Sequence, residues 1–290
     1  MQKIVNAMTV DVEDYFHVSA FENSIKKSDW HNLPLRVERN TYRLLELFEK
    51  HNVKSTFFTL GWVAERCPSL IKAIVDQGHE LASHGYNHKR ATEMTRTEFI
   101  SDVQQSKNIL EELSGKAVIG YRAPSFSIND SNTWVYDVLL ELGFKYSSST
   151  YPISHDLYGV PTWPRFPYQR QESSDNQKII EIPIPTIRKN DTNTGIGGGG
   201  YFRLYPYWLS KKRIEKFHQQ EKQPYSFYFH PWEIDPDQPR VKEAPLKSKF
   251  RHYINLSRME GKLEQLLKDY QWDTMQSVYL DKTVKVNGVT

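Results

Sequence analysis

The chain has 290 residues, and its net charge of +3 with 25% charged residues argues against a nucleic-acid binder built on a basic face. Aromatic residues reach 13%, a content that suits a groove for a flat or cyclic ligand such as a sugar ring, although packing accounts for most of them. The single cysteine, Cys67, excludes an internal disulfide and fits a reducing compartment.

The sequence carries no signal for export or membrane insertion. Residues 1–7 lack the apolar run of a signal peptide, and no stretch of about 18 apolar residues occurs that could form a transmembrane helix. We therefore expect a cytoplasmic protein without a transmembrane segment.

Apolar, β-branched and aromatic runs alternate with helical patterns along most of the chain. The predicted strands cover residues 4–12, 55–60, 79–83, 118–122, 145–149, 178–183 and 225–230, with a last strand near 272–279. The predicted helices cover residues 37–50, 68–77, 95–114, 134–142, 207–219 and 256–267. The third helix begins at a capping-box pair, Thr95 and Glu98, and ends before Gly115. This alternation predicts an α/β fold of parallel strands with right-handed crossovers.

Two segments interrupt this rhythm. Residues 150–177 are rich in proline and aromatic side chains and predict a long surface insertion. Residues 194–203 form a glycine-rich loop that lacks the features of a phosphate or dinucleotide cradle. This loop either lets Tyr201 and Arg203 approach a substrate or is slack between elements. Since no internal repeat occurs, we predict a single domain over 1–290, with a core of about 5–235 and a C-terminal extension over 236–290.

Three carboxylates, Asp11, Glu13 and Asp14, close the first predicted strand. Strand alternation places Asp11 and Glu13 on one face, and Val12 and Asp14 on the other. Crowded anions after an apolar strand repel one another unless a cation lies among them. The cluster therefore favours a functional site over the alternative, a solvated turn.

His84 and His88 follow the third predicted strand. Their His-x-x-x-His spacing recurs in divalent-metal sites, and with one carboxylate they would complete a set of protein ligands that leaves positions open for water. The alternative is a turn shaped by Gly85 and Asn87, with both imidazoles in solvent.

Arg122 and His230 end two further strands. Arg122 would keep Asp11 ionised and aimed, or form a structural salt bridge to another acid. His230, held by the proline that follows it, is suited to donate a proton to a leaving group, or is a hydrogen-bonded core histidine. Such groups at the carboxyl ends of successive strands are typical of an α/β active site.

Taken together and in order, four segments resemble the motifs of the polysaccharide deacetylases of the NodB-homology class, carbohydrate esterase family 4. These segments are Thr-Val-Asp-Val-Glu-Asp at 9–14, Ser-His-Gly-Tyr-Asn-His at 83–88, Tyr-Arg-Ala-Pro-Ser at 121–125 and Phe-His-Pro at 229–231. The Asp-Val-Glu-Asp-Tyr-Phe start, the Gly-Gly-Gly-Tyr-Phe-Arg loop and the His-Pro-Trp-Glu ending look closest to the branch found with exosortase-linked exopolysaccharide gene clusters. The resemblance implies a distorted (β/α)7 barrel, consistent with the strand count.

The resemblance also implies an activity and a division of roles. The enzyme would remove an N-acetyl group from an N-acetylhexosamine unit of a poly- or oligosaccharide precursor, using a divalent metal, usually zinc, held by one carboxylate with His84 and His88. Asp11 would be the base, Arg122 would orient it, and His230 would be the acid. Candidate substrate-binding residues are Tyr86, Pro124, Tyr201, Arg203 and Trp232.

One departure from the family pattern leaves the third ligand open. Val12 stands where the common form has a second aspartate, so the ligand is Glu13 or Asp14. Strand alternation and related branches with an Asp-x-Glu start favour Glu13, whereas Asp14 takes the role if the strand ends at Val12.

The deacetylase interpretation carries expectations about partners, and two other functions compete with it. The expected partner is a carbohydrate, with no nucleic acid, and a homo-oligomer is left open. One competing hypothesis is a hydrolase of cyclic amides or imides on the same scaffold. Another is a carbohydrate-binding relative that has lost the reaction, although a binder has no need of both a base and an acid.

Overall fold

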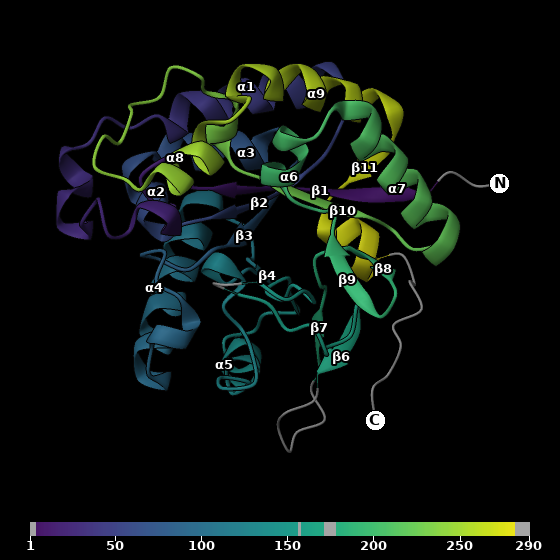
Figure 1. Cartoon of the computed structure of the whole chain (residues 1–290). Coiled ribbons are helices and arrows are strands. Elements are labelled where there is room, and N and C mark those ends of the chain that lie inside the picture. Colours follow the sequence, from purple (N-terminus) through teal and green to yellow (C-terminus); the bar gives the residue numbers. More distant parts are fainter. Residues whose placement is uncertain (1–3, 156–157, 171–177, 282–290) are drawn as a thin grey trace.

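The computed structural model describes residues 4–155, 158–170 and 178–281 (Figure 1). Within the predicted domain, residues 1–3 and 282–290 lie outside the described residues. Within the predicted insertion, residues 156–157 and 171–177 also lie outside them. A nine-stranded sheet with the order β10-β1-β2-β3-β4-β5-β7-β6 forms the centre, and β11 pairs with β1. Its strands are β1 (Val5–Val12), β2 (Thr56–Thr59), β3 (Glu80–Ser83), β4 (Gly120–Tyr121), β5 (Tyr146–Ser147), β6 (Tyr168–Arg170), β7 (Ile179–Glu181), β10 (Ser226–Phe229) and β11 (Gln271–Asp273).

The sheet curls into a half-barrel. Every pairing from β10 through β7 is parallel, and only the last strand, β6, pairs antiparallel, with β7. Among the described residues the strand order ends at β6 and β10 without joining them, so the barrel is open there. The predicted α/β class and the seven predicted strands up to His230 are confirmed, as β1 to β5, β7 and β10.

Helices cover the outside of the curled sheet (Figure 1). They are α1 (Val37–Lys50), α2 (Gly61–Arg66), α3 (Pro68–Asp76), α4 (Arg96–Ser114), α5 (Val135–Glu141), α6 (Gly199–Leu204), α7 (Tyr207–Glu221), α8 (Leu246–Tyr253) and α9 (Leu256–Asp269). The predicted capping box of α4 is present, because Thr95 Oγ1 accepts from the Glu98 amide and the Glu98 carboxylate accepts from the Thr95 amide. In the part of the chain that the structure describes, no helix is long and apolar enough to cross a bilayer.

Strand alternation sorts the core into two sides of the sheet. Val10 and Val12 of β1 belong to the large outer cluster that packs against the helices, together with Leu45 and Leu263. Ala7, two pleats before Asp11, belongs to a smaller inner cluster with Phe58 and Tyr146. Asp11 therefore lies on the inner face of the half-barrel, which is where a polar site needs it.

The structure differs from the predicted elements in five details. The predicted insertion contains β6, and the residues after β7 form a hairpin, β8 (Thr186–Lys189) with β9 (Thr192–Gly195). The predicted glycine-rich loop is not slack, because its second half begins α6. The last predicted strand is short, since β11 is followed by a helical turn over Gln276–Asp281. Helices α2 and α8 were not predicted.

Candidate metal centre and catalytic site

Six of the predicted site residues line one cavity at the carboxyl edge of the sheet. Strands β10, β1, β2, β3 and β4 are neighbours, and the register aligns Val12 with Thr59, Thr59 with Ser83 and Ser83 with Tyr121. Residues that follow these strands therefore emerge at the same level. The cavity has a volume of about 220 Å³, and its lining includes Asp11, Glu13, His84, His88 and His230.

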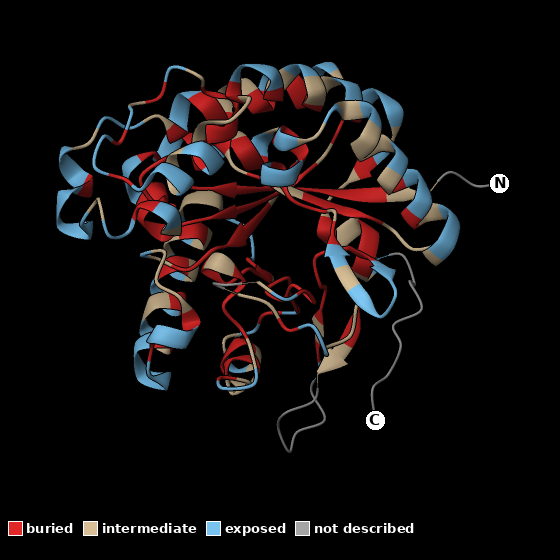
Figure 2. Cartoon of the chain, in the orientation of Figure 1, coloured by how far each residue is buried: buried red, intermediate tan, exposed pale blue. Residues whose placement is uncertain are grey.

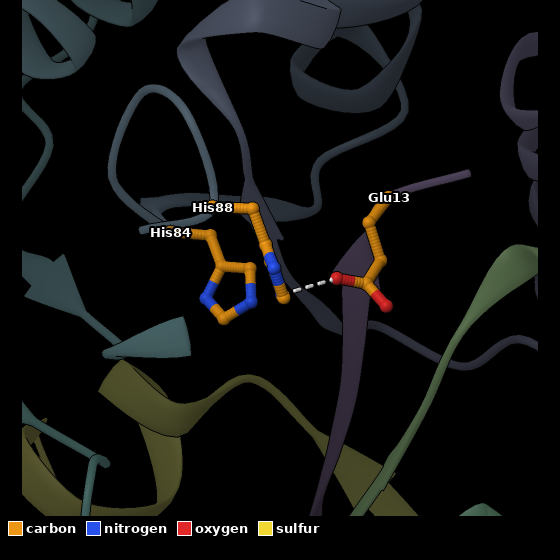
Figure 3. A group of neighbouring side chains, drawn as sticks. All are labelled: Glu13, His84 and His88. Atoms are coloured by element: carbon orange, nitrogen blue, oxygen red, sulfur yellow. Dashed lines mark ion pairs between the residues drawn. The ribbon is translucent and has the colours of Figure 1, made fainter. Parts of the chain in front are cut away.

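Glu13, His84 and His88 converge from two elements. Their ligand atoms all lie within 4.8 Å of one another, and Glu13 Oε2 lies 2.7 Å from His88 Nε2 (Figure 3). In Figure 3, Glu13 reaches over from the end of β1, and both imidazoles point toward it from the loop after β3. One carboxylate with two imidazoles is a donor set that zinc and other divalent transition metals accept.

The His84 ring is held in the tautomer that a metal ligand needs. Its Nδ1–H donates to the main-chain carbonyl of Arg122 at 2.7 Å, because a carbonyl oxygen only accepts. The Nε2 lone pair is therefore left for a ligand. Burial lowers the pKa of His84 to about 4, so the imidazole is neutral at pH 7.

Glu13 is ionised although it is buried. Burial on its own raises the pKa of the carboxyl, but the neighbouring His88 and His230 outweigh burial and hold the pKa below the ordinary value. A buried carboxylate that faces imidazoles fits a cation site, which agrees with the donor chemistry of the cluster.

Asp11 is bound by a fully buried arginine, Arg122. Arg122 Nη1 donates to Asp11 Oδ1 at 2.5 Å and to Thr9 Oγ1 at 2.9 Å. The rest of the guanidinium donates to the carbonyl and hydroxyl of Ser148, and it lies 4.0 Å from the ring centroid of Phe58. With its donors fixed in this way, Arg122 holds one oxygen of Asp11 and leaves Oδ2 on the side of His230.

His230 faces the two carboxylates across the cavity. Its Nε2 lies 3.6 Å from Glu13 Oε1 and 4.0 Å from Asp11 Oδ2, and its Nδ1–H donates to Glu233 Oε1 at 2.9 Å. Burial lowers the pKa of the imidazole, but Glu13, Glu233 and Asp11 outweigh it and raise the pKa to about 9. His230 is therefore a protonated donor at neutral pH, which is the state of a general acid.

Asp14 lies apart from this group. Its Oδ2 accepts from the amides of Arg36 and Val37 at 2.6 and 2.8 Å, where helix α1 begins, and its Oδ1 accepts from the Tyr15 amide. A carboxylate at a helix N-terminus satisfies amides that have no partner inside the helix. Of the two alternatives for the third ligand, the structure brings Glu13 to the histidines and leaves Asp14 as a helix cap.

Two of the candidate substrate-binding residues face a cavity. Trp232 lines the catalytic cavity, stacked between His230 and His252 with centroid separations of 5.1 and 4.2 Å, and its Nε1–H points to Glu13 Oε1 at 3.4 Å. Tyr201 lies in a neighbouring cavity lined by α6 and α8.

The other three candidates are turned away from open space. The Tyr86 amide donates to Asp102 and its hydroxyl to Glu65, so neither faces the site. Pro124 is buried in a helical turn behind the cavity wall. Arg203 is buried and donates to Glu233 at 2.7 Å. It therefore contacts Glu233, the acceptor for His230, and not the open cavity.

Glu233 was not predicted as a partner of His230 from the sequence. The His-x-x-Glu spacing in the helical turn Pro231–Ile234 was the available signal, because it brings the Glu233 side chain back to the imidazole of the residue that begins the turn. Arg203, the hydrogen-bond partner of Glu233, lies 30 residues before it in the chain. No local pattern in the sequence indicates this contact.

Strained backbone marks the cavity wall. His88, Ser125 and Phe126 all line the cavity and have φ values of 50°, 55° and 50°. Non-glycine residues with positive φ persist only where the surrounding structure holds them, and they cluster at functional sites. The strain therefore agrees with the placement of the site.

Comparison with known proteins gives two family matches along the chain. Residues 30–147 match the family described as "Polysaccharide deacetylase", and residues 148–280 match a "Domain of unknown function (DUF3473)". The first match includes His84, His88 and Arg122, the second includes His230, and Asp11 and Glu13 precede both.

A curated relative and two solved structures are similar to the chain. A peptidoglycan deacetylase of Helicobacter pylori is 36% identical over 153 residues, which cover 49% of this chain and 51% of that protein. The chain thus aligns with about half the length of that relative. A structure described as a polysaccharide deacetylase from Mycobacterium smegmatis has a TM-score of 0.62 at 18% identity, covering 99% of this chain and 94% of that one. The structure of PuuE allantoinase has a TM-score of 0.56 at 17% identity, covering 93% and 86%. At these identities both structures show a shared fold.

Proposed function

We propose, from the match of residues 30–147 to the polysaccharide deacetylase family and from the similarity to the Helicobacter pylori peptidoglycan deacetylase, that the chain belongs to that family and is a metal-dependent amide hydrolase that removes an N-acetyl group from an N-acetylhexosamine unit of a glycan. One observation carries the proposal. The Glu13, His84 and His88 donor set shares a single cavity with a carboxylate base, Asp11, and a protonated imidazole, His230.

The proposed metal ligands are Glu13, His84 and His88. A divalent metal in this position, most simply zinc, would polarise the acetyl carbonyl and lower the pKa of water from 15.7 toward about 7. The protein's part is to present the ionised Glu13 carboxylate and the neutral His84 imidazole with fixed orientation. The hydrogen bond from His84 to the Arg122 carbonyl provides that orientation.

Asp11 is the proposed general base. Its Oδ1 is held by Arg122 and its Oδ2 lies on the cavity side, so it is placed to take the proton of the attacking water.

His230 is the proposed general acid. An amide anion is a very poor leaving group, so cleavage of the carbon–nitrogen bond needs a proton on the departing amine nitrogen. His230 Nε2–H faces the cavity, while Glu233 holds Nδ1 and Arg203 holds Glu233. The acid is thereby fixed in place and charged before the substrate arrives.

The shape of the cavity favours a glycan over a free cyclic amide. A small heterocycle needs a closed cavity, whereas the catalytic cavity shares five lining residues with a neighbouring cavity of about 500 Å³. The presence of both a base and an acid likewise favours an enzyme over an inactive sugar binder. The exopolysaccharide branch stays a prediction of the sequence motifs, and the cytoplasmic location stays an expectation from the apolar patterning of the chain.

The test is acetate release from N-acetylglucosamine oligosaccharides by the purified protein, before and after chelation and again after zinc is added back. We expect activity that chelation abolishes and zinc restores. Activity that survives complete removal of metal would contradict the assignment of Glu13, His84 and His88. Ring opening of a cyclic amide without any acetate release would favour the competing hydrolase.

A further inference from the structure

Four of the six large apolar side chains that are exposed in the described residues gather on helices α6 and α8. Tyr201, Leu204 and Phe250 line one cavity and are 40%, 41% and 62% exposed. Leu246 is 82% exposed and precedes Phe250 by four residues, so the two side chains share one face of α8. We call these four side chains the apolar patch. Exposed apolar groups that gather in this way mark a binding surface.

Basic side chains accompany the apolar patch. Residues 240–251, which include α8, carry five basic residues and one acid, so this segment alone is more positive than the whole chain, whose net charge is +3. Lys247 and Arg251 line the same cavity as Phe250. Apolar side chains flanked by lysine and arginine are typical of a surface that lies in the headgroup region of an anionic bilayer. We propose that the apolar patch docks this protein on an anionic membrane surface.

Contacts on the other side of α8 hold the patch outward. His252 follows Phe250 by two residues, which places the two side chains on opposite sides of the helix. His252 is buried, stacks on Trp232 at 4.2 Å, and donates through Nε2–H to Gln238 Oε1 at 2.6 Å. Figure 2 shows exposed residues along the outer faces of α6 and α8. The helix therefore cannot turn Leu246 and Phe250 inward without breaking the contacts of His252.

The patch borders the catalytic cavity. The cavity that it lines shares five residues with the cavity of the metal-ligand cluster: Ser19, Ala20, Tyr158, Tyr228 and Arg251. A bilayer at the patch would therefore lie beside the site, and the substrate would be a glycan held at a membrane surface. This choice of substrate rests on the proposed function, whereas the docking does not. Both helices lie in residues 148–280, so the inference gives a role to the segment that matches a family of unknown function.

Sedimentation with unilamellar vesicles tests the docking. We expect the purified chain to sediment with vesicles made of equal parts phosphatidylglycerol and phosphatidylcholine, and to stay in solution with phosphatidylcholine alone, which offers no net charge. Raising the salt concentration from about 0.1 M to about 1 M shortens the Debye length from about 10 Å to about 3 Å and should weaken the binding.

Two substitutions separate the apolar and the basic contributions. Leu246→Ser should lower the vesicle partition coefficient at least about tenfold, the factor that about 1.4 kcal/mol of lost apolar burial produces. Lys247→Gln should lower it about fivefold, because each basic residue near an anionic surface contributes about 1 kcal/mol. Circular dichroism should show wild-type folding for both variants. Leu246 lines neither cavity, so Leu246→Ser should also keep the wild-type rate on soluble N-acetylglucosamine oligosaccharides.

The chain offers matched controls. Leu246→Met keeps an apolar side chain of similar size and should bind vesicles like the wild-type protein. Lys50→Gln removes the same charge as Lys247→Gln, but Lys50 is an exposed residue of α1 that lines neither cavity. It should therefore leave vesicle binding unchanged.

Two results would overturn the docking. One is a wild-type protein that does not sediment with anionic vesicles. The other is sedimentation that Leu246→Ser and Lys247→Gln leave unchanged. A patch that instead joins two copies of this chain would give a concentration-dependent dimer that Leu246→Ser dissociates, with no binding to vesicles, and this too would overturn the docking. Vesicle binding without any acetate release would leave the docking standing and refute the proposed function, and acetate release without vesicle binding would do the reverse.

Discussion

Replacing Glu233 with glutamine tests how His230 is kept protonated. Burial lowers the pKa of His230, and the negative charges of Glu13, Glu233 and Asp11 raise it to about 9. Glutamine keeps an acceptor for Nδ1–H but removes the charge. A hydrogen bond to a charged group contributes about 1.5–3 kcal/mol, and one pKa unit corresponds to about 1.36 kcal/mol. The pKa of His230 should therefore fall by roughly one to two units.

The sign of the effect on activity follows from the role of an acid. His230 donates only when protonated, so activity falls as pH rises through its pKa. A lower pKa in Glu233→Gln moves this alkaline limb of kcat/KM to lower pH by roughly one to two units. The assay is acetate release between pH 5 and 10 with a fixed metal concentration, because a cation beside Glu13 also lowers the pKa of His230 in both proteins.

The same substitution has a structural cost that must be separated from catalysis. Arg203 and Glu233 are both buried, and removing one partner of a buried pair destabilises a protein by about 3–5 kcal/mol. Glu260→Gln is the matched control, because its ion pair with Arg43 is exposed and contributes about 0–1 kcal/mol. An alkaline limb that stays at the wild-type pH in folded Glu233→Gln would refute the reasoning, whatever happens to stability.

Three further predictions follow from the site. Glu13→Ala should lose bound metal, whereas Asp14→Ala should keep the metal. Asp14→Ala should also lose about 0.5–2 kcal/mol of unfolding free energy, because the amides at the start of α1 lose their cap. Metal analysis and denaturant unfolding measure the two effects, and loss of metal in Asp14→Ala alone would reverse the ligand assignment. His230→Ala should bind metal at the wild-type level and lose about 10²–10⁴-fold in kcat, the range of general acid catalysis; retention of full turnover would exclude it as the acid. Arg122→Met should lower kcat at least about tenfold by freeing Asp11 and should destabilise the fold, since it leaves a buried carboxylate unpaired; unchanged kcat would show that Asp11 needs no orientation.

Much of the fold was predictable because its signals are local. Buried parallel strands read as apolar runs, and β1 shows this for residues 5–12. The capping box and Gly115 defined both ends of α4. Short elements escaped prediction, because α2 has six residues and β6 has three. Such lengths give too few residues for a period to be recognised.

The candidate site was predictable where it depends on strand ends and not where it depends on distant partners. Residues that follow neighbouring strands meet at one edge, so Asp11, His84, Arg122 and His230 were placed together from their order alone. The choice between adjacent carboxylates needed the position of α1, whose first amides bind Asp14.

Arg203 was predicted to contact substrate and is buried instead. The sequence shows that an arginine follows the glycine run. It does not show that Glu233 and three main-chain carbonyls accept hydrogen bonds from that arginine. The close packing at Gly198 and Gly199 was not predicted for the same reason, since the atoms that exclude a Cβ belong to Tyr228 and Glu233. Tertiary contacts of this kind leave no periodic trace in the chain.

The central claim is that Glu13, His84 and His88 hold one divalent metal. Anomalous diffraction from crystals grown with zinc, recorded on both sides of the zinc absorption edge, tests it directly. We expect a single strong peak at about 2.0–2.2 Å from one oxygen of Glu13 and from Nε2 of both histidines. A peak at Asp14, or full occupancy elsewhere with none between these three side chains, would contradict the account.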